Sequence, residues 1–163
     1  MGKLDEKQLS IVYTNRGAGF GKMGNDDQAL ADFTESIRIY PNNGFSYYNR
    51  GDLWYKRGKF DWAIEDLTKT IRLEPSFAQA RMARAVAFLA TNDGENALQG
   101  ADEMVKLLPD SGIALETRAY ILKAIGRRDD AIAEYRKAHA VEPNNLVLTK
   151  EIEAALRGLG AAP

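Results

Sequence analysis

The chain has 163 residues, a length typical of one domain, and its 22 basic and 23 acidic side chains leave a formal net charge of −1. This balance disfavours proteins that bind nucleic acids or anionic membranes through their overall charge. The chain has no cysteine, which excludes disulfides, thiolate metal sites and cysteine nucleophiles. Hydrophobic residues make up 45% of the sequence, enough to form a packed core.

The N-terminal segment has no features of a targeting signal. Residues 1–6 carry charges where a secretory signal needs an apolar stretch, and Glu6 stands where a myristoylation motif has serine or threonine. The longest nearly apolar run, 83–90, contains Arg84 and is less than half the ~20 residues of a membrane-spanning helix. We therefore expect a soluble protein without membrane insertion, and the sequence leaves open whether it resides in the cytoplasm or the periplasm.

Four of the five prolines recur at a fixed interval of 34 residues: Pro41, Pro75, Pro109 and Pro143. A constant period of this length is typical of repeat proteins. Alignment on these prolines divides the chain into four units, at 10–43, 44–77, 78–111 and 112–145. Each unit is expected to form one supersecondary structure that stacks on its neighbours.

Three positions within the units predict a helix, a turn and a second helix. The eighth residue is always small: Gly17, Gly51, Ala85, Ala119. The fifteenth is glycine or asparagine, which tolerate a left-handed conformation after a helix: Gly24, Gly58, Asn92, Gly126. The twentieth is always alanine: Ala29, Ala63, Ala97, Ala131. Small residues at fixed positions predict close helix crossings.

In chain order, these patterns predict helices at 8–22, 26–39, 44–57, 60–73, 78–91, 94–107, 112–125 and 128–141. The polar residues that follow the prolines are expected to cap the next helix: Asn42, Ser76, Asp110, Asn144. A ninth helix at 145–158 is predicted to cover the open end of the stack. Its predicted apolar stripe consists of Leu146, Ile152, Ala155, Leu156 and Leu159.

These features resemble the tetratricopeptide repeat. The similarity rests on the period, the small eighth residue, the alanine at twenty, the closing proline and a large eleventh residue: Phe20, Trp54, Phe88, Leu122. It covers residues 10–143, and segments 13–17 and 47–51 resemble a subgroup common in bacterial repeat proteins. The resemblance implies an all-α fold, a right-handed superhelical solenoid of antiparallel helix pairs, with 1–163 as a single domain.

No motif predicts an active site. The string Gly19 to Gly24 matches G-x-G-x-x-G, but it ends a predicted helix, whereas the dinucleotide-binding string joins a strand to a helix. His139 is the only histidine, so neither a histidine metal site nor a conventional catalytic triad has its other members. We therefore expect a protein that is not an enzyme and binds no cofactor, metal or nucleic acid.

The seventh position of each unit is arginine: Arg16, Arg50, Arg84, Arg118. The twenty-third position is acidic in three units, with Gly100 as the exception: Asp32, Asp66, Glu134. We predict that the arginines bind these acids as internal ion pairs instead of forming a phosphate-binding stripe.

The resemblance further implies that the first helices line a concave groove that binds a peptide or helix of a partner protein. Carried over by position, the expected partner-binding residues are Asn15, Phe45, Tyr48, Asn49, Asp52, Tyr55, Met82, Val86, Leu89, Glu116, Tyr120 and Lys123. The same concave positions include Ala18, Gly21, Lys22 and Lys56. Asn15 and Asn49 share the position at which related repeats use an amide to grip a peptide main chain. Against this stands the alternative that the tyrosines only pack on neighbouring helices.

Two further alternatives concern the whole chain. The end units or the apolar part of the groove could pair with a second copy, which would make the protein a self-associating structural module. The abrupt entry into the first unit also fits a piece of a longer repeat protein. A clamp for a terminal carboxylate is not expected, because Thr14, Ala18, Tyr48 and Asp52 stand where that clamp has basic residues.

Overall fold

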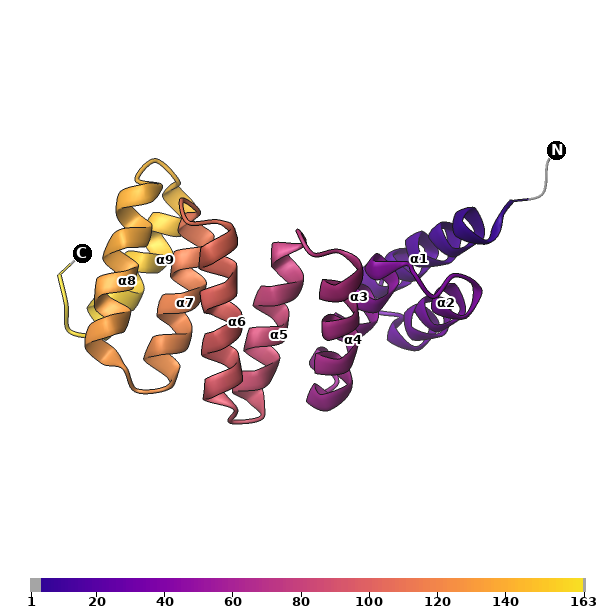
Figure 1. Ribbon diagram of the computed structural model, residues 1–163, viewed down its shortest axis with the longest axis horizontal. Helices are drawn as coiled ribbons and strands as arrows, with labels where there is room; N and C mark the ends of the chain where they lie inside the picture. Colours follow the sequence, from indigo (N-terminus) through magenta and orange to yellow (C-terminus); the bar gives the residue numbers. More distant parts are fainter. Residues whose placement is uncertain (1–3, 163) are drawn as a thin grey trace. The chain divides into compact units, whose positions relative to one another are not determined.

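The computed structural model describes residues 4–162. Within this range the chain forms nine helices and no strand (Figure 1). The helices are α1 (Glu6–Lys22), α2 (Asp26–Ile39), α3 (Gly44–Lys56), α4 (Phe60–Leu73), α5 (Ala78–Ala90), α6 (Gly94–Leu107), α7 (Gly112–Ala124), α8 (Arg128–Val141) and α9 (Leu146–Gly158). Their ends lie within two residues of the predicted ones, so the all-α helical-repeat prediction is confirmed.

The helices belong to two compact units, an N-terminal unit up to Ala87 and a C-terminal unit from Phe88. In the N-terminal unit α1 packs on α2, α2 on α3, and α3 on α4. In the C-terminal unit α6 packs on α7, α7 on α8, and α8 on α9. Each unit is therefore a stack of antiparallel helical hairpins. The assignment of the whole chain to one domain of four repeats remains a prediction.

The turns within the hairpins follow the predicted chemistry. Gly24, Gly58 and Gly126 have φ of 77°, 70° and 81°, and Asn92 has φ of 59°. These values lie in the left-handed region, where glycine has no side-chain penalty and asparagine has a small one. The fifteenth position of each unit therefore ends its first helix as predicted.

The helix caps differ from the prediction by one residue. Asn43, Ser111 and Asn145 accept hydrogen bonds from the amides of Ser46, Ala114 and Leu148, respectively. The prediction placed these caps at Asn42, Asp110 and Asn144, which are exposed turn residues. It was wrong because the proline and its successor complete the turn, and the cap must immediately precede the first helical residue.

The apolar stripe of α9 also differs in one member. Leu148, Ile152 and Leu156 are buried, whereas Leu146 is 72% exposed. Leu148 is four residues before Ile152 and so lies on the same helix face, while Leu146 points to another face. The predicted covering helix is thus present, with Leu148 in the place assigned to Leu146.

The close crossing within the first hairpin depends on Gly17. A Cβ at this residue would lie 2.7 Å from Cε1 of Phe33 and 3.1 Å from Cβ of Asp32. Ala29, on the facing helix, is fully buried. The small residues at the eighth and twentieth positions therefore allow the two helices to approach closely.

Helix α1 is attached to its neighbours by buried hydroxyl groups. Oγ of Ser10 lies 2.7 Å from Oγ of Ser36, and Oγ1 of Thr14 lies 2.6 Å from Oγ of Ser46. Nδ2 of Asn43 donates to Oγ of Ser10 at 2.8 Å. All five side chains are buried, and their mutual hydrogen bonds offset the loss of water. This polar cluster takes the place of large aliphatic side chains, which α1 does not bury.

The predicted arginine–acid pairs are present. Arg16 binds Asp32 through Nε and Nη2 at 2.7 Å each, and Arg50 binds Asp66 in the same way at 2.8 Å each. Nη1 of Arg118 binds Oε2 of Glu134 at 2.8 Å. In the third unit, where Gly100 replaces the acid, Nη1 of Arg84 approaches Oγ1 of Thr68 at 3.5 Å. The arginines are thus part of the internal structure of the hairpins.

Two glycines of α1 provide a matched test of this packing. Gly17→Ala should lower the free energy of unfolding by about 1–3 kcal/mol, because the new methyl group must displace Phe33. Gly19→Ala should raise it by up to ~1 kcal/mol, because a Cβ there meets no atom within 4 Å and alanine favours the helix. Urea unfolding followed by circular dichroism measures both values. Equal effects of the two substitutions would contradict the close crossing at Gly17.

Candidate functional site

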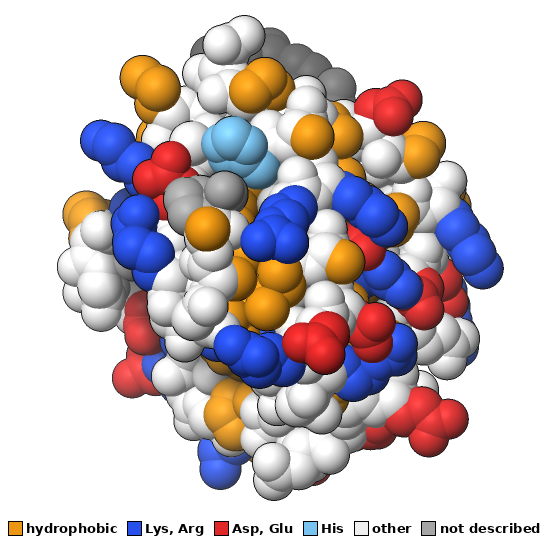
Figure 2. Space-filling view, turned by 90° about the vertical axis from the view of Figure 1, so that its left-hand side faces the viewer, with side chains coloured by type: hydrophobic (Ala, Val, Ile, Leu, Met, Phe, Trp, Pro, Cys, Tyr) orange, Lys and Arg blue, Asp and Glu red, His pale blue; other side chains and the backbone are white. Residues whose placement is uncertain are grey.

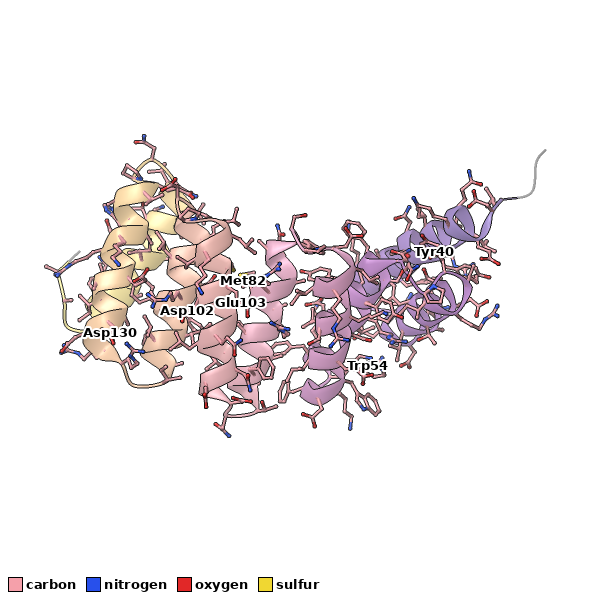
Figure 3. The ribbon with its side chains drawn as sticks, viewed as in Figure 1. Tyr40, Trp54, Met82, Asp102, Glu103 and Asp130 are labelled. Atoms are coloured by element: carbon pink, nitrogen blue, oxygen red, sulfur yellow. The ribbon has the colours of Figure 1, made fainter. Side chains whose placement is uncertain are left out.

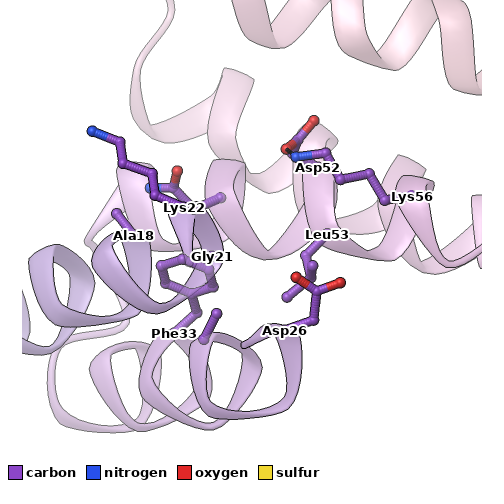
Figure 4. Close-up of a pocket in the computed structure, with 10 residues that line it drawn as sticks. Ala18, Gly21, Lys22, Asp26, Phe33, Asp52, Leu53 and Lys56 are labelled. Atoms are coloured by element: carbon purple, nitrogen blue, oxygen red, sulfur yellow. Dashed lines mark hydrogen bonds and ion pairs between the residues drawn. The ribbon is translucent and has the colours of Figure 1, made fainter. Parts of the chain in front are cut away.

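A pocket of about 260 Å³ opens in the N-terminal unit among α1, α2 and α3, and we call it the α1–α3 pocket (Figure 4). Its lining residues are Ala18, Gly21 and Lys22 of α1, Asp26, Ala29 and Phe33 of α2, and Asn49, Asp52, Leu53 and Lys56 of α3. Six of them occupy the predicted concave positions of two successive repeats. The stacking of hairpins therefore brings equivalent positions together at one site.

The pocket exists because α1 carries small residues where it faces α3. Gly21 has no side chain and Ala18 has only a methyl group. A Cβ at Gly21 would be 3.9 Å from Cβ of Ala29, so the site would accept a methyl group without a clash. The side chains of Phe33 and Leu53 give the pocket an apolar floor. This arrangement leaves room for a side chain from outside.

Charged groups surround this floor. Nζ of Lys56 lies 2.6 Å from Oδ2 of Asp52, and this hydrogen bond raises the pKa of Lys56. Lys22 stands on the α1 side and Asp26 at the start of α2 (Figure 4). The rim thus offers both positive and negative groups around an apolar centre, a combination suited to a peptide with polar main-chain atoms and an apolar side chain.

The two asparagines expected to bind a peptide have different surroundings. Asn49 lines the α1–α3 pocket, and its Nδ2 donates to the carbonyl oxygen of Phe45 at 2.8 Å. This bond holds the side chain along its own helix. The carboxamide oxygen of Asn49 has no hydrogen-bond partner among residues 4–162. Asn15 is exposed on α1 and does not line the pocket.

The aromatic residues of α3 pack mainly on their own unit. Tyr48 lies with its ring centroid 4.7 Å from that of Phe77, and Tyr55 lies 5.4 Å from Phe60. Phe45 also contacts the Phe77 ring, yet it stays 53% exposed. Tyr48 and Tyr55 therefore pack against neighbouring aromatic rings, which agrees with the alternative that the tyrosines pack on neighbouring helices. Phe45 is more than half exposed.

The other predicted partner-binding residues lie on α5 and α7. Met82 and Val86 are half-buried and lie on α5, before the end of the N-terminal unit at Ala87. Met82 is labelled in Figure 3. The C-terminal unit holds Leu89, Glu116, Tyr120 and Lys123. Tyr120 is 47% exposed. Burial raises the pKa of Glu116, and the nearby carboxylate of Glu151 on α9 raises it further.

The sequence indicated the α1 and α3 walls of the pocket but not the α2 contribution. Asp26, Ala29 and Phe33 belong to a second helix, and the carried-over positions described only first helices. The acidic first turn of α2 was visible in the sequence, where it suits the positive end of the helix dipole. Its second role at the pocket rim arises only when α2 packs beside α3.

The part of the chain that the structure describes contains no group of three histidine, cysteine, aspartate or glutamate side chains placed to hold a metal ion. None of the helices in residues 4–162 combines the length and apolar character needed to span a membrane.

Comparison with known families identifies the repeats. The sequence profile described as "Tetratricopeptide repeat" matches residues 45–77 and, in a second variant, residues 114–145. This chain is a tetratricopeptide-repeat protein. Among curated proteins no sequence matches it.

Solved structures show the same fold at low sequence identity. The tetratricopeptide-repeat chain is similar to the crystal structure of MamA, with a TM-score of 0.75 and 22% identity over 93% of this chain and 83% of MamA. MamA 41-end from Desulfovibrio magneticus gives a TM-score of 0.73 and 17% identity over 93% and 88%. The first TPR of Spaghetti (RPAP3), bound to an HSP90 peptide, gives 0.68 and 24% over 76% and 98%.

The buried Tyr135 of the C-terminal unit predicts a pH dependence of stability. This side chain is 1% exposed, and burial, followed by the charges of Glu116 and Tyr120, raises its pKa to about 12. Between about pH 10 and 12 the unfolded chain loses this proton while the folded chain keeps it. Stability should therefore fall by up to about 3 kcal/mol over this interval.

Denaturant unfolding from pH 9 to 12 measures this loss. Tyr135→Phe removes the titrating group, so the variant should show a smaller decrease than the parent over the same interval. The difference between the two proteins cancels the contribution of the other tyrosines. Parallel curves for the two proteins would show that the raised pKa of Tyr135 is wrong.

Proposed function

We propose that this tetratricopeptide-repeat protein is a non-catalytic scaffold that binds a peptide segment of a partner protein in the α1–α3 pocket. The proposal is supported chiefly by one observation: concave positions from two successive repeats line a single preformed pocket. Ala18, Gly21 and Lys22 contribute from the first repeat, and Asn49, Asp52 and Lys56 from the second. A preformed pocket requires little ordering on binding, which favours affinity.

The residues suggest how a peptide would bind. An apolar side chain of the partner would enter between Phe33 and Leu53 and be removed from water. The carboxamide of Asn49 can accept a hydrogen bond from a peptide N–H through its free oxygen. Lys22 and the Lys56–Asp52 pair would bind polar or charged groups of the same peptide at the rim.

The similar fold of the first TPR of Spaghetti (RPAP3), whose structure contains an HSP90 peptide, supports peptide binding by this architecture. The present chain has Thr14 and Ala18 on α1, and Tyr48 and Asp52 on α3, at the positions where a carboxylate clamp has basic residues. We therefore propose an internal peptide segment with an apolar side chain as the ligand of this pocket.

The remaining predicted residues are proposed as separate partner contacts. Phe45 offers an exposed ring in the N-terminal unit, which also holds Asn15 on α1 and Met82 and Val86 on α5. In the C-terminal unit, Leu89, Glu116, Tyr120 and Lys123 form the corresponding set. Tyr120 is the aromatic residue of this second set and is 47% exposed, and a half-exposed tyrosine is a typical anchor at protein interfaces.

Self-association is a second candidate function, favoured by exposed aliphatic residues in the C-terminal unit. They lie where α6 and α8 end and α7 and α9 begin, at one end of the hairpins: Leu107, Leu108, Ile113, Val141, Leu146 and Val147. Figure 2 shows a face of this unit on which hydrophobic side chains lie among basic and acidic ones. Exposed apolar residues at one end of the hairpins support the proposal of a contact surface for another copy.

The pocket is tested by binding to an array of short peptides of varied sequence. Asn49→Ala should weaken capture because it removes the free amide oxygen, and Ala18→Leu should weaken it because the larger side chain fills the pocket. Asn144→Ala is the matched control, since Asn144 is exposed outside the pocket. We expect about a tenfold loss for each pocket variant and no change for the control.

Capture that is equal for the parent and both pocket variants would refute the site. Sedimentation of the same proteins at several concentrations separates the second candidate. A dimer that dissociates on Leu146→Ser, with no loss of peptide capture, would favour self-association through the exposed aliphatic residues as an additional property.

A further inference from the structure

A second pocket of the N-terminal unit, of about 480 Å³, lies among α2, α3 and α4, and we call it the Arg50 pocket. Its lining residues are Ile37, Tyr47, Arg50, Glu65, Asp66, Thr68, Lys69 and Arg72. Tyr47 and Arg50 lie on the side of α3 opposite to Asn49, Asp52 and Lys56, as the helical period requires. The Arg50 pocket is therefore separate from the α1–α3 pocket.

Basic groups outnumber acidic ones in this pocket. Asp66 is neutralised by Arg50, which binds both of its oxygens through Nε and Nη2 at 2.8 Å. Lys69 stands over the Tyr47 ring with Nζ 6.0 Å from its centroid. Neither Lys69 nor Arg72 forms an ion pair with any residue between 4 and 162. Glu65, which is exposed, is the one acid that opposes them.

The guanidinium of Arg50 has unused capacity. With Nε and Nη2 committed to Asp66, Nη1 reaches only Oγ1 of Thr34, at 3.4 Å. This distance is at the long end for a hydrogen bond. A stronger acceptor that entered the pocket could therefore bind Nη1 without displacing Asp66.

The C-terminal unit shows what such an acceptor can be. Arg118 occupies the same repeat position as Arg50, and Asp102 occupies the position of Thr34, sixteen residues before the arginine in each case. Nε of Arg118 donates to Oδ1 of Asp102 at 2.5 Å, while its Nη1 binds Glu134 (Figure 3 labels Asp102). This arginine thus holds two carboxylates, one from its own hairpin and one from the preceding helix.

We propose that the Arg50 pocket binds a carboxylate side chain of an acidic peptide segment of a partner protein, on the side of Arg50 that faces Thr34, the repeat position equivalent to Asp102 beside Arg118. Nη1 of Arg50 donates to the carboxylate, and the ammonium of Lys69 and the guanidinium of Arg72 supply the neutralising charge. The hydroxyl of Tyr47 provides a further donor. Glu65 and the net charge of −1 disfavour a polyanion such as RNA.

This site is independent of the proposed function, because it lies on the other side of α3 and uses none of the same residues. The internal repeat supplies a direct test. Thr34→Asp places a carboxylate of the protein itself where Asp102 lies in the other unit, and it should block the pocket while leaving the fold intact, since Thr34 is exposed.

The probe is a blocked peptide of alternating glutamate and alanine, titrated into the full chain at low salt. The Nε–H resonance of Arg50 in a ¹H–¹⁵N spectrum reports binding. We expect a saturable shift of this resonance with the parent protein. Binding should be at least about tenfold weaker for Thr34→Asp and for the double variant Lys69→Ala with Arg72→Ala. Binding should be tighter for Glu65→Gln. The same peptide with glutamine in place of glutamate should not bind.

Two control variants make the outcome decisive. Lys137→Ala changes the residue equivalent to Lys69 in the C-terminal unit and should leave binding unchanged. Asn49→Ala should also leave it unchanged, so a failure of the α1–α3 pocket does not affect this result. Binding that survives both Thr34→Asp and the double variant would overturn the proposal, as would tighter binding of oligouridylate of equal charge.

Discussion

The close approach of two helices at a small residue determines most of the remaining structure of this protein. At Gly51 an added Cβ would lie 3.1 Å from Cγ of Leu67 and 3.3 Å from Cβ of Asp66, so even an alanine there would require these neighbours to move. Arg50 is the adjacent residue, and this approach places it beside Asp66. The same pairing recurs at Arg16 and Arg118. The small residue on the first helix lets the second helix approach closely. The arginine next to the small residue can then bind the acid on the second helix.

The two pockets of the N-terminal unit follow from the helical period of α3. Residues three and four apart share a face, which puts Asn49, Asp52 and Lys56 on one side of the helix. Tyr47 and Arg50 then lie on the other side, against α2 and α4. One helix therefore presents a surface of mixed polar and apolar character on one face, the proposed peptide site, and a basic surface on the other. The two surfaces have different chemistry, so each is suited to a different part of a partner.

The stacking of hairpins also gives the arginines at the seventh position different partners in different repeats, although the repeats share one sequence pattern. The arginine at the seventh position is constant, but the residue sixteen positions before it is Thr34 for Arg50 and Asp102 for Arg118. This position reads Thr34, Thr68, Asp102 and Arg136 along the four units, and its importance appears only because it belongs to the preceding hairpin. In one unit the arginine is satisfied by two acids, and in the other it keeps an available N–H group. Variation at a single position thereby converts a structural residue into a candidate binding residue.

The repeat period alone determined the helices, their turns and the arginine–acid pairs, because these depend on local conformation and on contacts within one hairpin. Only the tertiary structure decided which residues share a pocket, since Asp26 and Phe33 reach the α1–α3 pocket from a second helix packed beside α3. It also decided that Tyr48 and Tyr55 pack on Phe77 and Phe60, and that Leu148 is buried where Leu146 is not. The physical reason is that the burial of a side chain depends on the neighbouring helix that covers it. A sequence pattern specifies the helix face, but not what lies opposite that face.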